Sequence, residues 1–288
     1  MKKRIKNKRR NYKQYSSEDK IKNHKKSSAI RSRRKKRKKE KMLIRLMLII
    51  SMTLILASAG GLFIYWCHLS VQSNKLNELA DKVEQVLVIE NSGSDNSMIS
   101  KYEEIYKDNP DLFGWIKIDD TRIDYPVMQT PEDPEKYLRT NFEEKYSHAG
   151  LPFVDEECTK DSDNIIIYAH NMKDGSMFQT LFKYKKEKYW KEHPIIQFDT
   201  LYDEQEYEVL AVFYDRVYYK HEDVFKFYQF INAEDEADYK DAIKNYKEKQ
   251  LYDTGVEAEY GDQLITLVTC SYHEDNGRFV VVARKITE

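Results

Sequence analysis

The stretch DQLITLVTCSYHEDNGRFVVVARKI, residues 262–286, decides how the C-terminal part of the chain folds. Its two apolar runs, 263–269 and 278–286, are rich in Val, Ile and Thr, which is typical of β-strands. Between them, Asp-Asn-Gly at 275–277 is a strong turn signal, because Asn and Gly tolerate positive φ angles. We therefore expect the two runs to pair as an antiparallel hairpin.

This hairpin would bring a thiol and a guanidinium to one edge of the sheet. Cys270 ends the first run and Arg278 begins the second, and strand alternation puts Cys270 on the same face as Val268. A cation beside a thiol favours the thiolate, and its N–H groups can stabilise an oxyanion. The pair therefore suits a nucleophile with an oxyanion stabiliser. A single cysteine at a strand end is also often a small buried apolar residue, so the pair alone leaves both interpretations open.

A histidine supplies a third member of this candidate site. His170 follows the apolar run 164–168 and begins a polar loop, a common position for catalytic side chains. A Cys and a His distant in sequence form a standard nucleophile and acid/base pair for acyl transfer. His273 is nearer to Cys270 in sequence, but we expect it to be solvated within the turn. No two His or Cys residues have the spacing of metal ligands, so neither a metal nor another cofactor is expected.

Short apolar runs upstream of the hairpin predict six further strands. They lie at 114–118, 123–128, 151–154, 164–168, 194–198 and 206–214. Together with the hairpin, they favour a mainly β domain of eight strands, either a closed antiparallel barrel or a sandwich. Helices are predicted at 179–189 and 234–249. A shorter helix should begin at Ser100, with Glu103 completing a capping box, and end before Pro110.

Charge is strongly segregated along the 288 residues. The 48 basic and 49 acidic residues give a net charge of −1, yet residues 1–45 carry 22 Lys and Arg against three acids. The remaining 243 residues hold 26 basic and 46 acidic side chains. Such asymmetry indicates a membrane or a nucleic acid at one end. A hydrophobic fraction of 41% and an aromatic fraction of 13% exclude a chain that is disordered throughout.

An apolar segment favours the membrane. Residues 46–66, LMLIISMTLILASAGGLFIYW, carry no charge, and a helix of this length spans about 30 Å, the hydrocarbon thickness of a bilayer. Because the basic flank precedes it, the positive-inside rule predicts a cytoplasmic N-terminus. A cleaved signal peptide is the rival interpretation, but the basic region is too long and apolar sequence continues past Ala59. The basic residues are expected to contact anionic lipid headgroups, and no nucleic acid partner is expected.

These features predict four segments. Residues 1–45 form a basic cytoplasmic tail, 46–67 a transmembrane signal-anchor, 68–98 a stalk and linker, and 99–288 an extracytoplasmic catalytic domain. Helical spacing of apolar residues predicts the stalk, and the Gly/Ser-containing polar run at 91–97 predicts the linker. We thus expect a single-pass protein of the cell membrane with its catalytic domain outside the cell.

Three separated motifs resemble one enzyme family. Thr-Leu-Val-Thr-Cys at 266–270, followed by Arg278, matches the TLxTC signature of sortases, the membrane-anchored cysteine transpeptidases of Gram-positive cell surfaces. Residues 168–178, YAHNMKDGSMF, resemble the histidine loop of class B sortases, as do Gly-Trp-Ile at 114–116 and Ile-Asp-Tyr-Pro-Val at 123–127. Class B enzymes often carry Ser where this chain has Val268, so the resemblance leaves the sorting-signal preference open.

The resemblance implies a fold and a set of roles. The family has an eight-stranded β-barrel, expected here with an N-terminal helix, a helix before the cysteine strand and one preceding transmembrane helix. Cys270 would attack the Thr carbonyl of a C-terminal sorting signal, His170 would protonate the leaving amine, and Arg278 would stabilise the oxyanion. Arg284, on the same strand as Arg278, is the weaker oxyanion candidate. Substrate contacts are expected at Val268, Thr269 and Asn171.

The implied partners are a surface protein that bears the sorting signal and an amine of a cell-wall precursor or pilin. Two alternatives stay open. One is a cysteine endopeptidase that resolves the acyl-enzyme with water, and the other is a surface scaffold without catalytic activity. We expect Cys158, in a polar loop, to have no particular role and to form no disulfide with Cys270.

Overall fold

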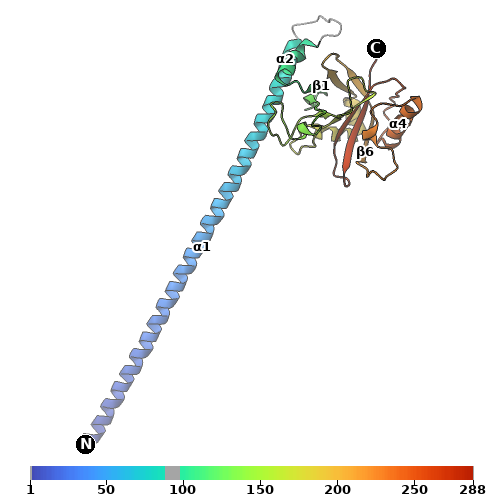
Figure 1. The fold of residues 1–288 in the computed structure, drawn as a ribbon. Helices are drawn as coiled ribbons and strands as arrows, with labels where there is room; N and C mark the ends of the chain where they lie inside the picture. Colours follow the sequence, from blue (N-terminus) through green and yellow to red (C-terminus); the bar gives the residue numbers. More distant parts are fainter. Residues whose placement is uncertain (1, 88–97, 288) are drawn as a thin grey trace. The chain divides into compact units, whose positions relative to one another are not determined.

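The computed structural model describes residues 2–87 and 98–287 (Figure 1). Residue contacts divide the chain into two units, 1–71 and 72–288, and each is described by itself. The linker predicted at 91–97 lies outside the described residues.

The first unit is formed by most of one long helix, α1 (Lys2–Leu87). By length and composition, Lys26–Cys67 is the one stretch in the described residues that is long and apolar enough to cross a membrane. A helix suits that environment because all its internal backbone N–H and C=O groups are hydrogen-bonded within the segment. The segment agrees with the single apolar helix expected ahead of the barrel.

Eight strands in the described part of the chain form a closed barrel (Figure 1). They are β1 (Leu112–Lys117), β2 (Asp124–Met128), β3 (Phe153–Val154), β4 (Asn164–Tyr168), β5 (Ile195–Thr200), β6 (Glu206–Arg216), β7 (Leu264–Cys270) and β8 (Gly277–Lys285). Neighbours follow the order β1-β2-β3-β4-β7-β8-β6-β5, and the pairing of β1 with β5 closes the barrel. The predicted eight-stranded barrel is confirmed.

Two strand pairs depart from the expected antiparallel arrangement. β2 pairs in parallel with β3, and β4 pairs in parallel with β7. Parallel pairing requires a long connection, and residues 169–263 supply it by forming β5 and β6 elsewhere in the barrel before the chain returns. The carboxyl ends of β4 and β7 therefore lie at the same edge.

Short helices accompany the barrel: α2 (Ser100–Asp108), η1 (Lys136–Leu138), η2 (Phe178–Lys185), α3 (Glu187–Glu192), η3 (Phe227–Gln229) and α4 (Glu236–Lys249). The helix predicted at 179–189 is instead the 3-10 helix η2 followed by the single short helix α3. α4 begins two residues later than predicted, because the Asp235 carboxylate caps it by accepting hydrogen bonds from the N–H groups of Ala237 (2.8 Å) and Asp238 (3.0 Å).

The capping box predicted at Ser100 is wrong. Ser100 is already helical, and the N-cap is Ile99, whose side chain makes no cap hydrogen bond. The Ile99 N–H donates to the carbonyl of Leu201 over 2.8 Å, and its side chain packs against buried apolar residues. These tertiary contacts place the start of α2.

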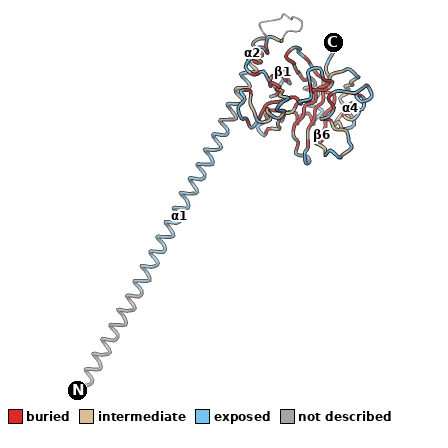
Figure 2. The backbone as a smooth tube through the Cα atoms, in the orientation of Figure 1, coloured by how far each residue is buried: buried red, intermediate tan, exposed pale blue. Residues whose placement is uncertain are grey.

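Buried residues are concentrated in the strands of the barrel (Figure 2). One core combines β4, β6, β7 and β8 with the buried face of α4, where Tyr246 stacks on Phe213 with ring centroids 5.8 Å apart. A second core joins Val83 of α1, Tyr102 of α2 and Trp115 of β1. The last turns of α1, which fall in the predicted stalk, thus pack against the barrel.

Candidate active site

The β7–β8 hairpin sets Cys270 directly opposite Arg278. Directly opposed residues of an antiparallel pair project from the same face, so the thiol and the guanidinium share one side of the sheet. The turn between them has Asn276 at a φ of 57°. Gly277 follows it, and a Cβ there would lie 2.6 Å from the Ser271 carbonyl oxygen, so only glycine fits. The Asn-Gly signal in the sequence thus corresponds to real local constraints.

The parallel pairing of β4 with β7 brings His170 to the same end of the sheet. Tyr168 is in register with Val268, and the Ala169 N–H donates to the Val268 carbonyl over 3.1 Å. His170 and Cys270 each lie two residues after this pair, Tyr168 and Val268. The structure therefore gathers the three residues predicted for catalysis at the adjacent ends of β4, β7 and β8.

Asn171 and Thr269 tie these strand ends together. Asn171 Nδ2 donates to the Cys270 carbonyl over 3.1 Å, and Thr269 Oγ1 donates to the Ala169 carbonyl over 2.8 Å. Thr269 and Val268 are each 1% exposed, which leaves neither side chain accessible to a substrate in this conformation. Asn171 is only partly buried. Of the three predicted substrate contacts, Asn171 is the one that is partly exposed.

The His170 ring is oriented by the β2–β3 connection. Its Nε2 lies 3.0 Å from the carbonyl oxygen of Leu138. A carbonyl only accepts hydrogen bonds, so Nε2 carries the proton and Nδ1 is left for proton transfer. Burial lowers the pKa of His170 below its ordinary value of 6.5, and electrostatic interactions with the nearby Arg139 and His148 lower it further. The Leu138 hydrogen bond opposes these effects in part.

The Arg278 guanidinium is steadied by its own turn. Nη1 donates to the carbonyls of Asn276 (3.2 Å) and Gly277 (3.0 Å), and the side chain remains partly exposed. Five N–H donors are available on a guanidinium, so donors remain for a bound oxyanion. Arg284, the weaker candidate, lies at the far end of β8, where it pairs with Glu208 of β6.

His273 is exposed, as expected. Its ring nitrogens also lie 2.9 Å from Ser271 Oγ and 2.9 Å from Glu274 Oε1, and its ring packs 4.9 Å from that of Tyr214, contacts that the sequence did not predict. One expectation needs correction. Cys158 was expected to have no role in a polar loop, but it is 3% exposed and packs in the barrel core. Its burial raises the pKa of its thiol to about 12. Cys158 and Cys270 are both free thiols.

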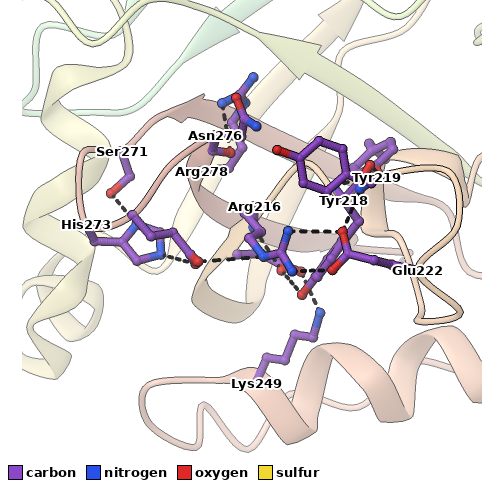
Figure 3. Close-up of polar contacts among 12 residues, drawn as sticks. Arg216, Tyr218, Tyr219, Glu222, Lys249, Ser271, His273, Asn276 and Arg278 are labelled. Atoms are coloured by element: carbon purple, nitrogen blue, oxygen red, sulfur yellow. Dashed lines mark hydrogen bonds and ion pairs between the residues drawn. The ribbon is translucent and has the colours of Figure 1, made fainter.

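A network of charged residues beside the hairpin was not identified from sequence (Figure 3). Arg216, the last residue of β6, forms ion pairs with Glu222 and, over 3.6 Å, with Glu274. Asp215, its buried neighbour, pairs with Lys249 of α4 over 2.5 Å. The sequence shows no regular spacing that predicts these ion pairs, because the paired residues come from one strand, two loops and a helix. In the described residues, no group of three or more His, Cys, Asp or Glu side chains is arranged to hold a metal ion.

Comparison with known proteins identifies the family. A family model described as Sortase domain matches residues 116–286, which include all three candidate catalytic positions. The chain belongs to the sortase family. It is 30% identical over 250 residues to sortase B of Listeria monocytogenes, covering 83% of this chain and 96% of the relative.

Solved structures place this sortase in class B. The Staphylococcus aureus sortase B–substrate complex has a TM-score of 0.65 at 27% identity and covers 74% of this chain and 95% of that one. Sortase B of B. anthracis in complex with AAEK1 has a TM-score of 0.64 at 28% identity and covers 75% and 96%. The sortase described here is therefore a class B cysteine transpeptidase.

Proposed function

We propose that Cys270, His170 and Arg278 carry the transpeptidation. The single observation behind this assignment is that the three residues lie at the same end of the barrel. Cys270 lies opposite Arg278 across β7 and β8, and His170 lies two residues after Tyr168, which pairs with Val268 of β7. A nucleophile, an acid/base group and an oxyanion donor are the three functions that acyl transfer requires.

The reaction proceeds in two steps. In the first, the Cys270 thiolate adds to the carbonyl carbon of a Thr in a C-terminal sorting signal, and Arg278 stabilises the negative charge that develops on its oxygen. The peptide C–N bond then breaks as the His170 imidazolium gives a proton to the leaving amine, which leaves a thioester. In the second, an incoming amine loses a proton to neutral His170 and displaces the Cys270 thiolate.

This cycle begins with a deprotonated thiol and a protonated imidazole. Because the pKa of His170 lies below its ordinary value, less than half of this residue is protonated at pH 6.5. The fraction of the enzyme that holds His170 as imidazolium at neutral pH is therefore smaller than for a histidine of ordinary pKa. We accordingly expect modest turnover that rises when the acceptor amine is concentrated.

The same proposal extends to location. Residues 1–45 would be a cytoplasmic basic tail, 46–67 a membrane anchor, 68–98 a stalk and linker, and 99–288 the catalytic domain outside the cell. The apolar stretch Lys26–Cys67 of α1 and the charge asymmetry of the chain support this arrangement. Protease protection in sealed vesicles tests the orientation: residues 1–45 should be protected in right-side-out vesicles, and the barrel should be digested.

The substrate would be a surface protein with a C-terminal sorting signal, and the acceptor an amine of a cell-wall precursor or pilin. Sortase B of Staphylococcus aureus has been solved as a substrate complex, and a sortase B has been solved in complex with triglycine. These relatives support a peptide donor and an amine acceptor for this chain.

The test uses the full chain in detergent, incubated with NPxTx and xPxTG peptides and analysed by intact-protein mass spectrometry. We expect a thioacyl adduct that is absent in Cys270→Ala and that is converted into amine-linked peptide when triglycine is added. Adduct that yields only free acid in the presence of triglycine would favour the endopeptidase. A folded chain that forms no adduct with either peptide would contradict the proposal and favour a scaffold.

A further inference from the structure

Arg216 is the centre of the charged network beside the hairpin (Figure 3). Its Nη1 donates to Glu222 Oε2 over 3.2 Å, its Nη2 pairs with the other oxygen of the same carboxylate, and its Nε lies 3.6 Å from Glu274 Oε2. The guanidinium also packs 4.3 Å from the ring centre of Tyr218. One side chain thus binds two carboxylates from two different loops in a fixed fork geometry.

The first of these loops follows β6. Glu222 accepts a hydrogen bond from the Tyr219 N–H over 2.7 Å, so the carboxylate held by Arg216 also folds the segment after Arg216 back on itself. The hydrogen bonds from Arg216 keep the pKa of Glu222 below its ordinary value. This carboxylate is therefore ionised throughout the neutral range.

The second loop is the turn that follows Cys270. Glu274 Oε1 lies 2.9 Å from His273 Nε2, and the other nitrogen of that ring lies 2.9 Å from Ser271 Oγ. Ser271 is the residue after Cys270 and is buried. A continuous chain of polar contacts thus runs from the Arg216 guanidinium through Glu274 and His273 to the neighbour of the nucleophile.

Backbone contacts also join the end of β6 to the β7–β8 turn. The Val217 N–H donates to the Asn276 carbonyl over 3.0 Å, and Asn276 is one of the two carbonyls that hold the Arg278 guanidinium. Arg216 is itself in register with Gly277 across β6 and β8. The network therefore reaches the peptide groups on both sides of the turn, next to Cys270 and next to Arg278.

We propose that Arg216 is a positioning residue for the transpeptidation: through Glu274 and His273 it holds the β7–β8 turn so that Cys270 and Arg278 keep the spacing the tetrahedral intermediate requires. The inference rests on the proposed roles of Cys270 and Arg278 and adds a residue that touches neither substrate nor reacting atoms. Small displacements of reacting groups are costly, about 100-fold for a misplacement near 1 Å.

The central variant is Arg216→Gln in the full chain in detergent. We expect the kcat for thioester formation, with whichever of the NPxTx and xPxTG peptides acylates the unmodified enzyme, to fall by about 10- to 100-fold. KM should change less than about twofold. Arg216→Lys should recover part of the rate, since one ammonium can reach one carboxylate but cannot fork to two.

The chain offers a matched control in Arg284. Arg284 is 28% exposed, against 27% for Arg216, and it too bridges two carboxylates, Glu208 and Asp262, at the opposite end of the β6–β8 pair. Arg284→Gln should leave kcat unchanged. An equal loss of kcat in both variants would show a general effect of removing strand arginines and would overturn the inference.

A double variant tests the route of action. If Arg216 acts through Glu274, then Glu274→Gln alone should lower kcat, and adding it to Arg216→Gln should cause no further loss. Two results would refute the positioning role and instead place Arg216 in contact with substrate. One is a loss of kcat in the double variant equal to the product of the losses in the two single variants, and the other is a rise in KM with kcat unchanged. Acylation of Arg216→Gln at the unmodified rate would also refute it. Absence of acylation in the unmodified enzyme would refute the proposed function itself, so the two failures are distinct.

Discussion

Asn171 donates a hydrogen bond from Nδ2 to the carbonyl oxygen of Cys270, 3.1 Å away and 99 positions later in the sequence. The residue after the candidate acid is thereby fastened to the backbone of the candidate nucleophile. A long segment of the chain connects β4 to β7. This hydrogen bond holds the carboxyl ends of these two strands together, where the chemistry would occur.

Removing that bond should slow the enzyme. A hydrogen bond of this kind contributes about 0.5–1.5 kcal/mol net, so we expect Asn171→Ala to lower kcat/KM by about three- to tenfold. Asn171→Asp should be worse, because it places a carboxylate against a carbonyl oxygen. Steady-state kinetics with a sorting-signal peptide would measure both effects. Equal activity in Asn171→Asp and the unmodified enzyme would contradict this explanation.

The positive charge at Arg139 should control the protonation of His170. Arg139 and His148 both lower the pKa of His170, after the larger effect of burial. Arg139→Gln removes the Arg139 charge, so the His170 titration should move to higher pH and a larger fraction of His170 should be imidazolium at neutral pH. NMR titration of the imidazole resonances would detect the shift. A midpoint that moves to lower pH would show the opposite sign and disprove the assignment.

The two thiols of the barrel should differ in reactivity. Cys158 is buried, and burial raises the pKa of its thiol to about 12, so almost no thiolate exists at neutral pH. Cys270 is partly exposed at a strand end. Brief treatment of the folded protein with iodoacetamide, followed by peptide mass spectrometry, should find alkylation at Cys270 and not at Cys158. In urea both should react, which serves as the control.

A buried charge cluster should contribute strongly to stability. Lys101, 7% exposed, lies 2.8 Å from Asp199 and 2.5 Å from Glu204, and the Tyr102 hydroxyl donates to the same Asp199 carboxylate over 2.6 Å. Asp199→Ala removes a shared acceptor from these buried donors and should lower the free energy of unfolding by about 3 kcal/mol.

Chemical denaturation would measure the loss of stability in Asp199→Ala. The exposed pair of Lys188 with Glu192 provides the control, and Lys188→Ala should change nothing measurable. If the two variants were equally stable, the buried cluster would not have the stabilising role assigned to it.

The end of α1 should stabilise the barrel. Val83 is buried in the second core with Tyr102 and Trp115. Complete burial of a Val side chain contributes about 1.5–3 kcal/mol, so a chain beginning at Gln72 should melt at a higher temperature than one beginning at Met98. Val83→Asp in the longer chain should remove most of the difference. Identical melting temperatures for the two chains would show that these turns add nothing.

Much of the molecule follows from local sequence. Strand alternation and β-branched composition locate β4, β7 and β8 to within a residue or two, and the Asn-Gly turn at 276–277 predicts that Cys270 and Arg278 meet across a hairpin. The apolar stretch at 46–66 predicts a helix of membrane length. These features depend on residues that are neighbours in the chain, so a short window of sequence contains the forces that produce them.

Tertiary packing decided the rest. Three features join segments that are far apart in the sequence: the parallel pairing of β4 with β7, the contact of the Leu138 carbonyl with His170, and the ion pair of Arg216 with Glu274. No repeating pattern in the sequence predicts these contacts. Their partners are chosen by which strands lie side by side once the barrel closes, and by which polar groups must be satisfied there. The sequence alone therefore determined the chemical groups and the elements that carry them, while the closed barrel decided which of those groups touch.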